Sequence, residues 1–126
     1  PSITFEQLSK KPMIMLDLPY TRDYFFGLFR ARGLEPDVAH STRSSEIAKA
    51  LVEGDFGFTL LNIRPRNYSP KDSRYSVVPI SDSSDVPVFG ISTTGNLRQP
   101  KNVRSFIKIC TKLRDDGIFD SCTVTA

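Results

Sequence analysis

Polar and aromatic residues follow three short apolar segments, and at these positions the chain could contact a small molecule. The residues are Pro19, Tyr20, Thr21, Ser41, Thr42, Leu61 and Asn62. Hydroxyl groups, backbone N–H donors and a tyrosine ring suit a small organic anion or a polar aromatic molecule. Thr21 and Thr42 are also residue types that cap helices, and spacing alone favours capping over binding. The pattern therefore predicts a candidate ligand-binding set and leaves both roles open.

Catalytic chemistry finds little support in the sequence. His40 is the single histidine, so any Ser–His–Asp or Cys–His mechanism would have to use it. It falls in or at the end of an expected strand, where a packed or hydrogen-bonded histidine is favoured. Asp17 and Asp23 have no recognisable partner for acid–base catalysis, and Asp23 suits the first turn of a helix. We therefore expect no catalytic residue and no enzymatic activity.

Metal, cofactor and phosphate motifs are not indicated either. Cys110 and Cys122 have neither CxxC spacing nor a histidine nearby, so no disulfide framework or zinc site is expected. The run of residues 54–57 (GDFG) precedes an expected strand, whereas a phosphate loop opens a helix. We expect no metal and no cofactor.

Composition describes a soluble globular chain. Its 126 residues are 39% hydrophobic and 25% charged, which fits one domain or a piece of a larger one. No apolar run approaches the roughly 20 residues that span a bilayer, and residues 1–4 do not resemble a signal peptide. With only two cysteines, a cytoplasmic protein without a membrane segment is expected. Because residue 1 is Pro1 rather than Met, we also expect a processed or truncated chain.

The net charge of +3 is a weak argument for nucleic-acid binding, because basic and acidic residues are interspersed. One basic stripe stands out on the last expected helix: Lys101, Arg104, Lys108 and Lys112. A solvated helix face explains this stripe better than a phosphate-binding face does, because no aromatic or glycine residues are interleaved with it.

Hydrophobic patterning predicts an α/β fold with a parallel sheet. Strands are expected at residues 12–18, 37–41 and 56–61. Helices are expected from Thr21 to Arg32, and from a cap at Thr42 or Ser44 to Gly54. The order strand–helix–strand–helix–strand specifies right-handed crossovers. Ligands bind beyond the carboxyl ends of such strands, so the three candidate segments should meet at one edge of the sheet.

The second part of the chain is less regular. Residues 63–76 are expected to form an exposed loop, followed by strands at 75–80 and 86–93. A final helix opens at Pro100 with an apolar face. This face consists of Val103, Phe106, Ile107, Cys110 and Leu113. We expect it to fold back onto the sheet or to be covered by another copy of the chain.

Several sequence segments resemble the second lobe of LysR-family effector-binding domains. They are residues 4–8 (TFEQL), 35–39 (EPDVA), 45–47 (SEI), 51–61 (LVEGDFGFTLL) and, near the end, 86–93 with Gln99, Pro100 and 103–106. The resemblance covers most of the chain, and its most specific part is residues 51–61. Asn62 departs from the family, which usually has proline there.

The resemblance implies a type II periplasmic-binding-protein-like fold, truncated relative to the two-lobed domain. Residues 1–92 would form the second, effector-binding lobe, and residues 93–126 the crossover and C-terminal helix returning to the first lobe. It further implies a small organic effector, a homo-oligomer and DNA binding only through a domain absent from this chain. A lobe of a solute-binding protein of similar fold is the alternative, and a small α/β enzyme is less favoured.

Overall fold

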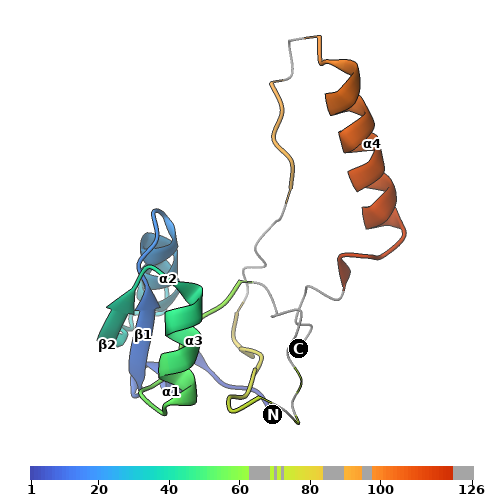
Figure 1. The fold of residues 1–126 in the computed structure, drawn as a ribbon. Coiled ribbons are helices and arrows are strands. Elements are labelled where there is room, and N and C mark those ends of the chain that lie inside the picture. Colours follow the sequence, from blue (N-terminus) through green and yellow to red (C-terminus); the bar gives the residue numbers. More distant parts are fainter. Residues whose placement is uncertain (63–68, 70, 72, 84–89, 95–97, 121–126) are drawn as a thin grey trace.

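The computed structural model describes residues 1–62, 69, 71, 73–83, 90–94 and 98–120. The elements, in chain order, are α1 (Phe5–Ser9), β1 (Pro12–Leu16), α2 (Thr21–Arg30), β2 (Asp37–Thr42), α3 (Ser45–Glu53) and α4 (Lys101–Asp115). Figure 1 shows α1 to α3 gathered around the two strands, with α4 standing apart from them.

β1 is the central strand. It pairs in parallel with β2: Pro12 lies opposite Asp37 and, after a register shift between Met13 and Ile14, Leu16 lies opposite Thr42. On its other side, Met13 forms a parallel bridge with Phe58. The chain thus passes from β1 through α2 to β2 on one side of β1, and then through α3 to Phe58 on the other side of β1. Because both crossovers of such a unit are right-handed, this reversal puts α2 and α3 on opposite faces of the sheet.

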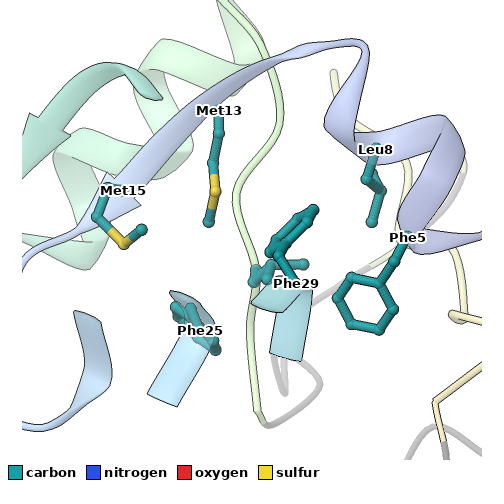
Figure 2. Close-up of a cluster of buried hydrophobic side chains, with 7 residues drawn as sticks. Phe5, Leu8, Met13, Met15, Phe25 and Phe29 are labelled. Atoms are coloured by element: carbon teal, nitrogen blue, oxygen red, sulfur yellow. The ribbon is translucent and has the colours of Figure 1, made fainter. Parts of the chain in front are cut away.

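The main core lies on the face of β1 that α1 and α2 cover. Met13 and Met15 point to this face, since side chains alternate along a strand. Figure 2 shows them directed toward the aromatic rings of α1 and α2. The cluster consists of Phe5, Leu8, Met13, Met15, Phe25, Phe29 and Leu60. Burying each large side chain of this kind stabilises the fold by about 1.5–3 kcal/mol.

The opposite face of β1 carries a smaller apolar contact. Ile14 is fully buried but lies outside the main cluster, and Ala48 of α3 is 1% exposed. The predicted burial of the first strand on both faces is therefore confirmed, because Met13, Ile14 and Met15 are all buried.

α1 was not among the expected elements, although the sequence carries its signal. The Thr4 side chain accepts a hydrogen bond from the Gln7 N–H, and the Gln7 side chain accepts one from the Thr4 N–H. This reciprocal pair is a capping box, in which a threonine and a glutamine three residues apart satisfy two unpaired helix donors. The pattern T-x-x-Q at residues 4–7 was thus sufficient to predict a helix start.

The prediction of a third strand at residues 56–61 is wrong in extent. Only Phe58 bridges to β1, through hydrogen bonds from the Ile14 N–H to the Phe58 carbonyl (2.7 Å) and from the Phe58 N–H to the Pro12 carbonyl (3.0 Å). Before Phe58, positive φ angles at Asp55 (63°) and Gly57 (143°) interrupt the extended chain.

The later strand predictions are also mostly wrong. Within residues 75–80, only Ile80 forms a bridge, and its partner is Ile3. Residues 86–89 lie outside the described residues, and residues 90–93 form no strand. Most of the loop expected at 63–76 likewise lies outside the described residues.

The predicted final helix is confirmed as α4, with Pro100 at its N-cap and Gly117 (φ 74°) beyond its end. No residue of α4 is buried, so the expectation that its apolar face folds back onto the sheet is wrong. Phe106 is 59% exposed, and Ile109, on the same face but missed in the predicted stripe, is 58% exposed. No helix in the described part of the chain is both long and apolar enough to cross a membrane.

Candidate ligand-binding edge

The carboxyl ends of the strands bring the predicted residues to the same end of the sheet. β1 and β2 end together, and beyond them the Asp17 N–H donates to the Thr42 carbonyl at 2.8 Å. The chain at Phe58 runs parallel to β1, and the Thr59 hydroxyl donates to the Ile14 carbonyl at 2.9 Å. Leu61 and Asn62 therefore continue toward the same edge.

Tyr20 is the most distinctive residue of this edge. Its backbone is left-handed (φ 64°, ψ −27°), a conformation that costs a non-glycine residue roughly 1–2 kcal/mol. Its side chain packs little against the rest of the protein, because the residue is 88% exposed. The structure thus holds an aromatic ring out into solvent at the start of α2.

α2 begins without a side-chain cap. Tyr20, not Thr21, occupies its N-cap position, and no side chain accepts a hydrogen bond from the first turn. The predicted capping role of Thr21 is therefore wrong. The Thr21 and Arg22 N–H groups donate to the Leu18 carbonyl, at 3.1 and 3.4 Å. The positive end of the helix dipole still faces this edge, where it favours a negatively charged or polar group of a ligand.

α3 begins differently, because its own side chains satisfy its first turn. Of the two predicted caps, Ser44 is the one used, and its hydroxyl accepts from the Ile47 N–H at 3.4 Å. The Thr42 hydroxyl accepts from the Ser44 N–H at 3.2 Å and so shapes the turn. A backbone N–H of the first turn, followed by the Ser45 and Ser44 hydroxyls, holds the pKa of Glu46 below its ordinary value. The N-terminus of α3 is thus already occupied by a carboxylate of the chain itself.

The remaining predicted residues leave the edge open. Pro19, Ser41 and Asn62 are exposed, and Leu61 is 40% exposed. An ion pair between Arg22 and Asp17 (3.7 Å) lies here too, with both side chains well exposed, so it adds little stability.

A hollow of about 430 Å³ lies elsewhere, between α1, the start of β1 and Val78. Its lining residues are Ser2, Ile3, Gln7, Lys10, Lys11 and Val78, and none of them belongs to the predicted edge. Lys11 and Pro12 are at the amino end of β1, whereas a parallel sheet binds ligands at the carboxyl end. We therefore base the candidate site on the edge and not on this hollow.

His40 lies in β2 and is exposed, so the predicted packing of this histidine is limited to one ring contact. Its ring meets the Phe56 ring edge-on, with the centroids 5.7 Å apart. Among the described residues, no group of three or more histidine, cysteine, aspartate or glutamate side chains could hold a metal ion.

This parallel α/β unit with an open carboxyl edge has the fold class of a type II periplasmic-binding-protein-like domain, in a truncated form. The LysR substrate binding domain model matches residues 1–114, so the chain belongs to this family. It is an effector-binding regulatory domain of the LysR type.

Solved structures agree with this assignment. The chain is 29% identical to HinK, a LysR family transcriptional regulator from Pseudomonas aeruginosa, with a TM-score of 0.68 over 88% of this chain and 39% of HinK. It is 25% identical to the C-terminal domain of a probable LysR family transcriptional regulator from Rhodococcus sp. RHA1, with a TM-score of 0.71 over 87% of this chain and 55% of that domain. The chain thus spans well under two thirds of the length of either structure. No curated protein matches the chain significantly.

Proposed function

We propose that the carboxyl edge of the sheet is one wall of a binding site for a small organic effector. The seven residues predicted from the sequence form this wall: Pro19, Tyr20, Thr21, Ser41, Thr42, Leu61 and Asn62. The observation that carries the proposal is the start of α2, where a helix N-terminus without a side-chain cap adjoins a strained, solvent-exposed Tyr20. The two groups suit an anionic or polar effector with an aromatic or apolar part.

The second wall of the site comes, in this proposal, from a first lobe outside the chain. Residues 1–92 form the effector-binding lobe, and residues 93–126 return toward the first lobe. This arrangement accounts for an edge that is open rather than concave, since a site between two lobes closes only when both are present. It also gives the apolar face of α4 a place to pack.

The regulator to which this domain belongs then controls transcription as a homo-oligomer in the cytoplasm. DNA is bound by a separate domain, and this chain performs no catalysis. The scattered charge of the chain supports this assignment, as does the lack of a nucleophile and orienting partner at recognisable spacing from His40, the single histidine. A transfer or hydrolysis reaction that is lost in His40→Ala would contradict it.

Gentle purification of the intact protein, followed by mass spectrometry, tests the site. We expect a small molecule to co-purify with the wild-type protein and to be lost in Tyr20→Ala. A matched control is Tyr75→Ala, because Tyr75 is outside the proposed wall. Equal retention of the molecule by the wild-type protein and by Tyr20→Ala would contradict a role for this edge.

A further inference from the structure

Ile3, near the start of the chain, lies beside residues 79–81, which precede the segment that leads toward α4. The Ile3 N–H donates to the Pro79 carbonyl at 3.0 Å, and the Ser81 N–H donates to the Ile3 carbonyl at 3.0 Å. Ile3 and Ile80, which are far apart in the sequence, thereby form a parallel bridge. The outgoing segment, residues 79–82, is thus held against the incoming one before the chain continues toward α4.

Asp82 ends this contact at the first turn of α1. Its two carboxylate oxygens accept from the Phe5 N–H at 3.1 and 3.2 Å. Thr4 and Gln7 already satisfy other donors of the same helix end. A carboxylate at a helix N-terminus is also favoured by the helix dipole, so Asp82 acts as a cap supplied from far along the sequence.

Arg32 joins Asp82 to α2. Its Nε lies 3.7 Å from the Asp82 carboxylate, and its guanidinium also donates to the Asp82 carbonyl. Another guanidinium nitrogen donates to the Leu28 carbonyl in the last turns of α2, at 2.8 Å. The guanidinium carbon stands 4.4 Å from the centre of the Phe5 ring, which in turn packs edge-on against Phe29 (5.0 Å between centroids).

These contacts distinguish Arg32 from an ordinary surface cation. Its side chain is 20% exposed, whereas exposed ion pairs such as Arg114–Asp115 have side chains that are 69% and 60% exposed. Arg32 also combines hydrogen bonds to two different segments with a stacking contact, which a planar guanidinium can do and a lysine cannot. Such an arrangement fixes the relative positions of α1, α2 and the outgoing segment.

We propose that Arg32 is a positioning residue that, with Asp82, clamps the outgoing segment to α2. The segment that leads toward α4 is then tied to the helix that begins at Tyr20. Only the role of Tyr20 at an effector site rests on the proposed function; the clamp itself rests on the contacts around Arg32 and Asp82. Through it, a displacement of α2 is passed to the chain that leaves the lobe.

Amide hydrogen exchange on the full chain, followed by NMR without any ligand, tests the clamp. The reporters are the Ile3 and Ser81 N–H groups, and the internal reference is the Ile14 N–H, which donates to Phe58. In Arg32→Met, we expect the protection of both reporters to fall about fivefold relative to Ile14, as the loss of roughly 1 kcal/mol of local stability implies. Methionine keeps an unbranched chain over the Phe5 ring and removes the charge and the donors.

Arg30→Met is the matched control. Arg30 is exposed at the end of the same helix, and its guanidinium carbon lies 5.4 Å from the Phe26 ring, away from Asp82. We expect it to leave the relative protection of both reporters unchanged. In Asp82→Asn, protection should also fall, and adding Arg32→Met to Asp82→Asn should cost less than the sum of the two single changes.

Unchanged relative protection in Arg32→Met, or full additivity of the two substitutions, would overturn the clamp. Neither result would affect the proposed effector edge, because Arg32 lies beyond the C-terminal end of α2, whereas Tyr20 is at its N-terminal end. Conversely, failure to recover an effector would leave the exchange experiment interpretable.

Discussion

At the scale of single residues, two non-glycine residues of the described chain have left-handed backbones, Tyr20 (φ 64°) and Asp55 (φ 63°). Asp55 belongs to the turn that ends α3, and aspartate tolerates this conformation better than tyrosine does. Tyr20 has no such local reason. Strain of this kind concentrates at functional sites, where the surrounding structure maintains it.

Tyr20→Gly should therefore raise the free energy of unfolding, by about 0.5–1 kcal/mol, because glycine adopts this conformation without strain and little packing is lost. Urea denaturation measures the change. Asp55→Gly, the control, should change stability less and leave effector retention intact, whereas Tyr20→Gly should reduce that retention. A clear loss of stability in Tyr20→Gly would mean that the ring packs on the protein in solution.

Gly57 is required for a different reason, the close approach of Pro12. A Cβ built at Gly57 would lie 2.2 Å from the Pro12 carbonyl oxygen, at a backbone φ of 143°. Gly57→Ala should destabilise the fold by about 3 kcal/mol or more, since backbone must shift. Gly27→Ala is the matched control, because a Cβ there meets nothing within 4 Å and alanine favours the helix by roughly 0.5–1 kcal/mol. Thermal unfolding of both variants checks this, and equal melting temperatures would contradict it.

At the scale of elements, α2 is attached to the lobe by one side only. Phe29 is fully buried in the core cluster. Phe26, on the same helix, packs only at the edge of this cluster, is partly buried and lies near Arg22 and Arg30. The helix therefore has a core face and a solvated face, and these should differ in energy.

Phe29→Ala should lower the free energy of unfolding by about 3–5 kcal/mol, because it leaves a cavity beside Phe5. Phe26→Ala should cost less than half as much, since its ring is partly solvated already. Chemical denaturation of the two variants measures the difference. Equal losses would show that the packing of α2 differs from that in Figure 2.

At the scale of the whole molecule, α4 has an apolar face on which no other described element packs closely enough to bury a residue. Val103, Phe106, Ile109 and Leu113 are between 36% and 59% exposed on one face. A contiguous apolar surface of this kind normally marks an interaction site. The face that the sequence analysis expected to be buried thus has no cover among the other described elements.

The chain by itself should consequently self-associate through α4, with an apparent mass that rises with concentration in light scattering. Phe106→Glu should suppress this rise, because a carboxylate in the apolar face opposes its burial. Lys108→Glu changes a charge on the polar face of the same helix and should leave association largely unaltered. A monomer at all concentrations, with no difference between these variants, would exclude self-association through this face.

The sequence by itself determined the local elements. The apolar run at 12–16 is a strand because alternate side chains find cover on both faces, and α2, α3 and α4 follow from helical spacing. The same patterns placed Pro19 to Thr21 after β1 and Ser41 and Thr42 at the end of β2, as in the structure, whereas Leu61 and Asn62 follow a single bridge at Phe58. Even α1, which the sequence patterns were not used to predict, has a local signal, the capping box of Thr4 and Gln7.

Only the tertiary structure decided what depends on distant residues. Only Phe58 of the predicted third strand bridges to β1, next to the close approach of Gly57 to Pro12. Of the strand predicted at 75–80, only Ile80 forms a bridge, and its partner is the distant Ile3. No pattern within a short window relates Arg32 and Phe5 to Asp82, because their contacts join segments up to 77 residues apart. The N-cap of α2 had the same origin: the left-handed turn at Tyr20 puts this residue, and not Thr21, at the N-cap, and backbone conformation of that kind is set by the surrounding fold.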